Sequence, residues 1–219
     1  MENPQITEST ESLDGRNTFT TARLKANPAV ADLAVPLDEG MAAMKLAQGH
    51  YEAILVTVAS ALAIRNAAND EADGLTRRVF RLCQAEDGTN KKSGRVARYF
   101  PDGLNAVIYG PIADQPHEMR IVASKLESDP QSELAAFAAM LLQKAEALED
   151  QVADHDVLMG QQEVAFGQVQ NARAEWINKY VKVYGDLVSR LGKAKAETYF
   201  KSLKKTRKAG APPADPTPA

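Results

Sequence analysis

Apolar side chains recur at alternating intervals of four and three residues along two long stretches of this chain. The first stretch runs from Leu37 to Cys83 and the second from Ala138 to Leu187. This spacing places the side chains on one face of a helix and is typical of long helices that pack lengthwise against each other. The sequence therefore predicts an all-α fold, an antiparallel bundle of long helices arranged as a helical hairpin or in a four-helix-like way.

The composition agrees with a helical protein and argues against several other classes. The 219 residues are 44% hydrophobic but only 6% aromatic, which favours helices over a β-sandwich or barrel. A net charge of −3 argues against a dedicated nucleic-acid-binding protein. Cys83 is the single cysteine, so an internal disulfide is excluded. The first residues do not resemble a secretory signal, and we therefore expect a cytoplasmic location.

A corner is predicted where the first long helical pattern must stop. Pro101 cannot donate a backbone hydrogen bond, and it restricts the backbone of Phe100 before it. Gly103 can adopt the positive φ of a chain reversal. We therefore expect the residues from Tyr99 to Leu104 to form a fixed corner between helices.

The remaining chain is expected to divide into three parts. Residues 1–17 are polar and lack apolar spacing, so we expect a flexible segment. Residues 18–203 are predicted to form one helical bundle domain, with the corner inside residues 87–113. Residues 204–219 are predicted to be a basic and then proline-rich disordered tail. Helix starts are expected at Pro36, Asp114 and Pro130, with a kink or break near Gly160.

Polar residues interrupt both apolar stripes near their middles. Arg65 and Asn69 lie on the first stripe, and the helix either continues through them or breaks within residues 69–74. Antiparallel packing would bring Arg65 near His155 and Asp156, and Asn69 near Gln151 and Val152, in one polar layer. Two interpretations stay open. The layer is either a small-ligand or proton-linked site or a contact that fixes the register of the helices.

No sequence pattern for catalysis or metal binding is present. The three histidines lack ligand-like spacing, and the Glu-x-x-His pairs of di-iron bundles do not occur. Residues 69–74 resemble the opening of a calcium loop, but Phe80 stands where a bidentate glutamate is required. Phosphate-binding glycine loops and nucleophile elbows are also absent. We therefore predict a protein that is not an enzyme and that has no cofactor.

Basic residues cluster near the C-terminus at Lys201, Lys204, Lys205, Arg207 and Lys208. Such a segment can contact the phosphates of a nucleic acid or of an anionic membrane surface. The other interpretation is solvated C-terminal charge.

The two long helical patterns resemble each other at their starts and ends. Pro36 leads a helical pattern that ends in Tyr99-Phe100, and Pro130 leads one that ends in Tyr199-Phe200. Duplication of a helical unit is one interpretation of this resemblance, and chance similarity between alanine-rich helices is the other.

The stretch from Arg98 to Leu104 resembles the corner of alanine-rich bacterial helical-bundle proteins. In that group a long helix ends in a Tyr-Phe-Pro-x-Gly-Leu motif. The resemblance implies a bacterial origin and a helical bundle. It implies no activity and supplies no catalytic residue.

These observations predict a structural or protein-interaction protein that self-assembles. A helix of about fifty residues is about 75 Å long, and two such helices alone have a thin core. Further apolar surface should then bind another copy or another helical protein, and Ala53, Val56, Ala59 and Ala63 lie beside the first stripe. One alternative is a helical protein that inserts residues 53–64 into a membrane after a conformational change. A third is a nucleic-acid-associated protein that uses the basic segment.

Overall fold

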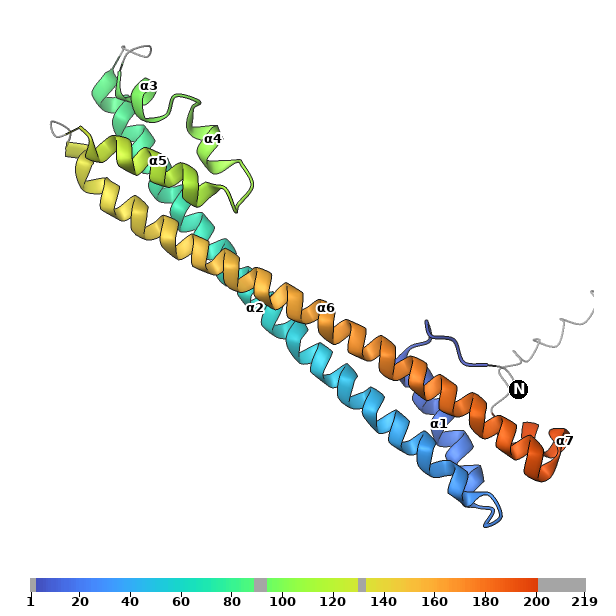
Figure 1. Cartoon of the computed structure of the whole chain (residues 1–219). Helices are drawn as coiled ribbons and strands as arrows, with labels where there is room; N and C mark the ends of the chain where they lie inside the picture. Colours follow the sequence, from blue (N-terminus) through green and yellow to red (C-terminus); the bar gives the residue numbers. More distant parts are fainter. Residues whose placement is uncertain (1–2, 89–93, 130–132, 201–219) are drawn as a thin grey trace, which may run out of the picture. The chain divides into compact units, whose positions relative to one another are not determined.

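Helices joined by turns make up the part of the chain that the structure describes. The computed structural model describes residues 3–88, 94–129 and 133–200, and within these ranges it contains no β-strand (Figure 1). In chain order the elements are α1 (Thr10–Lys25), the 3-10 turn η1 (Ala31–Leu33), α2 (Ala34–Asp87), α3 (Arg95–Tyr99), α4 (Leu104–Ile108), α5 (Gln115–Glu127), the 3-10 turn η2 (Glu133–Ala135), α6 (Ala136–Leu191) and α7 (Lys193–Glu197). The predicted all-α fold is confirmed.

Both long helices run without a break. α2 spans 54 residues and continues through residues 69–74, so the alternative of a hairpin there is wrong. α6 spans 56 residues and does not break at Gly160. No proline lies in either helix beyond the first turn, and a helical glycine costs only about 1 kcal/mol relative to alanine. That local cost is too small to end helices of this length.

The described helices form two compact units, and each has its own core. Unit 1 comprises residues 1–49 and 167–219, and unit 2 comprises residues 50–166. The sequence predicted one bundle domain over residues 18–203, because the apolar stripes continue from one unit into the other. The structure replaces that single domain with two units that share the two long helices.

In unit 1, α1 packs on the first turns of α2 and the last turns of α6. The large buried side chains are Leu13, Leu24, Leu37, Met41, Met44, Trp176, Tyr180 and Leu187. α1 begins at Thr10, where the hydroxyl of Ser9 accepts a hydrogen bond from the Ser12 N–H. The prediction of a flexible segment over residues 1–17 is therefore wrong for residues 10–17, which form the first half of this helix.

In unit 2, α5 packs on α2 and α6 (Figure 1). Its buried side includes Met119, Val122 and Leu126, as the sequence predicted. Facing them are buried residues of the two apolar stripes: Ala72, Val79, Cys83, Ala138, Leu141, Ala145 and Leu148. The helix-start prediction at Asp114 is confirmed, since α5 begins at the next residue.

The corner between α3 and α4 has the predicted form. Tyr99 and Phe100 are buried, and the Phe100 ring meets the edge of Phe80 at a centroid distance of 5.2 Å. Gly103 has a φ of +81°, a value that disfavours any side chain, and Leu104 begins α4 directly after it. The chain therefore turns on a glycine while the aromatic pair closes the core of unit 2.

Tyr199 and Phe200 play the matching part in unit 1. The Phe200 ring meets Tyr180 and Tyr184 edge-on at centroid distances of 5.0 and 5.4 Å. Each unit thus buries one Tyr-Phe pair in its own core, and duplication of a helical unit stays a hypothesis. The predicted helix start at Pro130 and the tail over residues 204–219 lie outside the described residues.

Candidate functional site

Unit 2 exposes apolar side chains along part of its long helix pair. Four residues of the predicted stripes remain more than one-third exposed: Leu55 (37%), Leu62 (38%), Met159 (38%) and Phe166 (48%). The stripes were predicted to be packed along their length, and at these positions they are packed only in part: the Phe166 ring still contacts the Tyr51 ring of α2 at a centroid distance of 5.7 Å. Asp156 and Glu163 lie beside them on α6 and are also exposed. We call the surface formed by these six residues the open face.

The open face continues the surface that α5 covers. Gln115 at the start of α5 donates a hydrogen bond of 2.6 Å to Asp73, and Arg120 of α5 pairs with Glu149. On α2, Leu62 lies about three turns before Asp73 and on the same side of the helix. On α6, Asp156 lies about two turns after Glu149, again on the same side. In the described part of unit 2, no third helix covers this continuation. The α2–α6 pair is therefore covered by α5 over one stretch and uncovered over the next.

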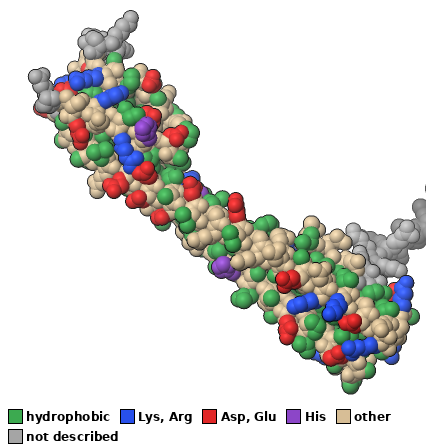
Figure 2. Space-filling view, viewed as in Figure 1, with side chains coloured by type: hydrophobic (Ala, Val, Ile, Leu, Met, Phe, Trp, Pro, Cys, Tyr) green, Lys and Arg blue, Asp and Glu red, His purple; other side chains and the backbone are tan. Residues whose placement is uncertain are grey.

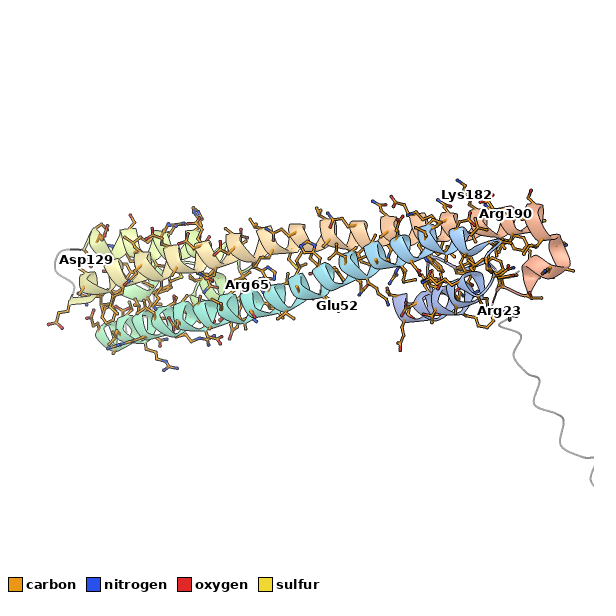
Figure 3. The ribbon with its side chains drawn as sticks, turned by 90° about the horizontal axis from the view of Figure 1, so that it is seen from below. Arg23, Glu52, Arg65, Asp129, Lys182 and Arg190 are labelled. Carbon is orange, nitrogen blue, oxygen red and sulfur yellow. The ribbon has the colours of Figure 1, made fainter. Side chains whose placement is uncertain are left out.

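The predicted polar layer lies at the boundary between these two stretches. The Nη1 atom of Arg65 is 3.4 Å from Nδ1 of His155, and Nδ1 is 3.6 Å from a carboxylate oxygen of Asp156. Figure 3 shows Arg65 between α2 and α6. Asn69 is half-buried one turn further along α2 and takes no part in this contact. The structure thus brings together three of the four residues.

The contact between Arg65 and His155 has the geometry of one that fixes the register of two helices. His155 is buried, Arg65 is half-buried, and the Asp156 side chain is 72% exposed. Arginine has no acceptor, so the Arg65 guanidinium can donate to Nδ1 only when that nitrogen carries no proton. A shift of either helix by one residue would leave a charged or polar group buried without its partner. This geometry favours the register interpretation, and the interpretation as a small-ligand or proton-linked site stays a prediction.

A groove of about 410 Å³ lies along the same helix pair. Its walls come from α2 (Thr57, Ser60, Ala61, Ile64) and from α6 (Gln151, Asp154, Val157, Leu158). Asp154 is the only titratable residue among them. The Thr57 and Ser60 hydroxyls donate to the carbonyl oxygens of Ala53 and Val56 on their own helix, so no hydrogen bond joins either one to a base in this groove.

A second groove, of about 500 Å³, lies between α1 and α2 in unit 1. Its charged side chains form pairs with one another: Lys25 contacts Asp38 at 2.7 Å, and Lys45 contacts Asp14 at 2.8 Å. Each lysine already has a carboxylate partner, so this groove shows no free charge directed at a ligand.

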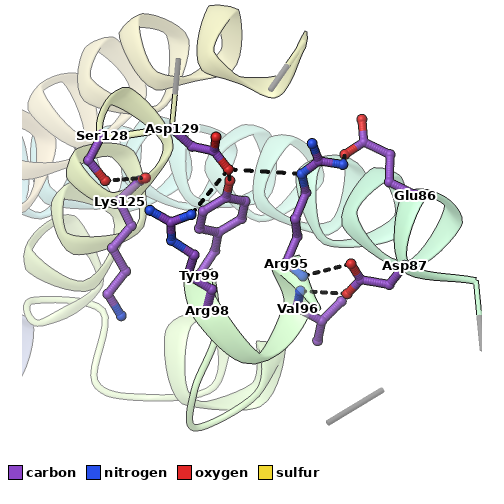
Figure 4. A network of polar contacts seen from close by, with 9 residues as sticks. All are labelled: Glu86, Asp87, Arg95, Val96, Arg98, Tyr99, Lys125, Ser128 and Asp129. Atoms are coloured by element: carbon purple, nitrogen blue, oxygen red, sulfur yellow. Dashed lines mark hydrogen bonds and ion pairs between the residues drawn. The ribbon is translucent and has the colours of Figure 1, made fainter. Parts of the chain in front are cut away.

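The corner of unit 2 carries a polar network that sequence reasoning missed (Figure 4). The Asp87 carboxylate accepts hydrogen bonds from the backbone N–H groups of Arg95 (2.6 Å) and Val96 (2.8 Å), and so caps α3. Asp129 accepts a hydrogen bond from the Tyr99 hydroxyl and lies 3.4 Å from a guanidinium nitrogen of Arg98. These contacts join the end of α2, the corner and the end of α5. The polar groups of the network bond to one another across these three segments.

The predicted anion-contact residues lie outside the described residues. They are Lys201, Lys204, Lys205, Arg207 and Lys208. The structure describes the chain as far as Phe200, which is buried in unit 1, and the predicted anion contact therefore stays a prediction.

The fold and the candidate site define a class: an all-α protein in which a long helix pair is covered in one stretch and exposes apolar residues in the next. No protein-family model, curated protein or solved structure matches this chain. The resemblance to alanine-rich bacterial helical-bundle proteins stays a prediction. Among the described residues, no helix is both long enough and apolar enough to cross a membrane.

Proposed function

We propose that this chain is a non-enzymatic helical protein that self-associates through the open face of unit 2. One observation carries the proposal. Side chains of the apolar stripes are buried under α5 near Ala72 and Leu148 but exposed at Leu55, Leu62 and Met159. A single amphipathic surface of one helix pair is thus covered in one stretch and open in the next. Contiguous exposed apolar surface is typical of a protein-protein contact.

The free energy gained by burying the exposed apolar side chains of the open face predicts weak association. Full burial of a large aliphatic or aromatic side chain contributes about 1.5–3 kcal/mol. Covering the exposed third to half of four such side chains would then contribute about 2–5 kcal/mol. Loss of translational and rotational freedom costs about 4 kcal/mol or more. We therefore expect self-association that depends strongly on protein concentration and that needs further contacts besides the apolar ones.

Sedimentation velocity over a range from low-micromolar to near-millimolar protein tests the proposal. The wild-type chain should shift from monomer to larger species as the concentration rises. Replacing Leu62→Gln and Met159→Gln together should move that transition to higher concentration, by roughly tenfold for each 1.4 kcal/mol lost. Leu46→Gln is the matched control, because Leu46 is 77% exposed in unit 1 and lies outside the open face.

Two outcomes would contradict the proposal. The first is a wild-type chain that remains monomeric at near-millimolar concentration. The second is a Leu46→Gln control that weakens association as much as the two open-face substitutions together. Circular dichroism of each variant checks that the helices persist. The proposal assigns no catalytic residue and no cofactor to the described residues. The alternative of membrane insertion through residues 53–64 stays a prediction, and liposome leakage would test it.

A further inference from the structure

Charge is distributed unevenly between the two units. Residues 50–166, which form unit 2, hold 11 Lys and Arg against 18 Asp and Glu, a net charge of −7. The rest of the chain holds 15 Lys and Arg against 11 Asp and Glu, a net charge of +4. Figure 2 shows acidic side chains along the helix pair of unit 2, with hydrophobic ones between them. A partner for unit 2 should therefore be basic.

The open face itself also carries acidic side chains next to apolar ones. Asp156 and Glu163 lie two turns apart on one side of α6, beside the exposed side chain of Met159. Pairing two open faces around a two-fold axis would bring these carboxylates toward their copies in the other chain, and like charges in contact oppose association. Charge therefore opposes a two-fold pairing of this face with its copy and favours a basic segment as its partner.

The same chain carries a basic segment of matching sign. Residues 201–208 contain five Lys and Arg and no acidic residue. In the sequence the segment follows Phe200, which is buried in unit 1 against Tyr180 and Tyr184. Nineteen residues follow Phe200 in the chain, and Asp215 is the only acidic one among them. The chain therefore contains both an acidic, partly apolar surface, the open face, and a basic segment of opposite charge.

We propose that the open face of one copy binds residues 201–208 of a second copy. This inference rests on the proposed function and names the partner of its surface. The lysine and arginine side chains would pair with Asp156 and Glu163, and Leu203 would lie on the exposed apolar side chains. Such a contact joins different surfaces of two copies, so it is heterologous. It produces rings or open chains when it runs in one direction, and a closed dimer when two copies exchange their segments.

Truncation and salt provide the first test. A chain that ends at Phe200 keeps every described residue and removes the basic segment. Sedimentation velocity should show self-association of the full chain that weakens roughly tenfold or more between about 50 and 500 mM NaCl, because exposed charges are screened at high salt. The truncated chain should remain monomeric at concentrations where the full chain associates.

A charge swap provides the second test. The open-face variant Asp156→Lys with Glu163→Lys should not associate, and neither should the tail variant Lys204→Glu with Lys205→Glu. Mixing the two variants should restore association, because the native open face of the tail variant then meets the native basic segment of the open-face variant. Asp102→Lys with Glu127→Lys is the matched control, since both residues are exposed acids of unit 2 outside the open face.

The outcomes separate this inference from the proposed function. Self-association that persists in the truncated chain overturns the tail contact and leaves the open face as a self-associating surface. Failure of the mixed variants to associate also overturns it, as does equal loss in the Asp102 and Glu127 control. If the full chain never associates and its tail instead binds duplex DNA, both proposals fall.

Discussion

The indole nitrogen of Trp176 donates a hydrogen bond of 3.1 Å to the side-chain oxygen of Asn17. The amide nitrogen of Asn17 in turn donates to a carboxylate oxygen of Asp38 at 3.2 Å. The buried side chain of Asn17 therefore connects α1 to both α6 and α2. Both Trp176 and Asn17 are buried in unit 1, so neither group can exchange its partner for water without opening the packing.

We expect Asn17→Ala to destabilise unit 1. The substitution leaves the buried Trp176 N–H without an acceptor, which costs about 1–3 kcal/mol. Urea unfolding followed by tryptophan fluorescence measures the loss directly, because Trp176 is the only tryptophan in the chain. Thr18→Ala, at an exposed neighbour on the same helix, should change stability by less than about 0.5 kcal/mol. Equal effects of the two substitutions would show that the bond contributes nothing.

The same residues explain why the sequence did not predict the first half of α1. Apolar spacing is the main signal for a helix, and the helix buries only Leu13 and Leu24 as large apolar side chains. Its remaining buried residues are polar and include Arg16 and Asn17, which have no periodic signal of their own. The contacts of Asn17 are with Asp38 and Trp176, which lie far away in the sequence. The long stripes, by contrast, are a local pattern, and the helices they predict are present.

Acid should destabilise unit 1 through Glu8. Burial raises the pKa of Glu8, but hydrogen bonds from the Gln5 N–H, Arg16 and Ser12 outweigh it and hold that pKa below its ordinary value of 4.5. The resulting stabilisation is present above pH 4.5 and is lost as pH falls through the folded-state pKa. Arg16 is buried and forms a two-pronged contact with Glu8, with both distances 3.0 Å.

Glu8→Gln tests this acid dependence. At neutral pH the variant should be less stable than the wild type by about 1–3 kcal/mol, since a charge-assisted contact is weakened. As the pH falls below 4.5 and then through the lowered folded-state pKa of Glu8, the two proteins should become similar, because the wild-type carboxylate also loses its charge. Urea unfolding at several pH values gives both results. A constant difference across the pH range would contradict the assignment.

The candidate site was predictable only in part. Matching the ends of two antiparallel helices was enough to place Arg65 near His155, because helix rise is regular over many turns. The exposure of Leu55 and Phe166 was not predictable, since the stripe looks the same whether or not a third helix covers it. The start of α5 was predictable, but its placement on α2 depends on the Gln115 contact with Asp73, which no local pattern encodes.

Asp87 should be a strong determinant of the corner. Its carboxylate caps the two first N–H groups of α3, and a Cβ atom at Gly94 would collide with it. Asp87→Ala should cost about 1–2 kcal/mol, the usual effect of losing a helix N-cap. Asp102→Ala, at an exposed corner residue, is the control and should have little effect. Hydrogen exchange at the Arg95 and Val96 amides should rise in the first variant only.

Cys83 should be unreactive in the folded chain. Burial raises the pKa of its thiol from an ordinary 9.0 to about 12, with the nearby Asp87 and Glu86 charges acting in the same direction. Between pH 9.0 and about 12 the unfolded thiol ionises while the folded one stays protonated, so stability falls as pH rises. Cys83→Ala should remove that part of the pH dependence. Alkylation of the native protein near pH 9.0 should follow unfolding, and fast alkylation would contradict the burial.

Two glycine substitutions should have effects of opposite sign. Gly103 has a φ of +81° at the corner, so Gly103→Ala forces a side chain into a strained backbone and should destabilise unit 2 by about 1–2 kcal/mol. Gly160 lies in the interior of α6, and an added Cβ would meet no atom within 4 Å. Gly160→Ala should therefore stabilise the helix by about 0.5–1 kcal/mol, because alanine loses less backbone entropy than glycine on folding. Thermal unfolding of both variants gives the comparison, and stabilisation by Gly103→Ala would show that the corner does not require its positive φ.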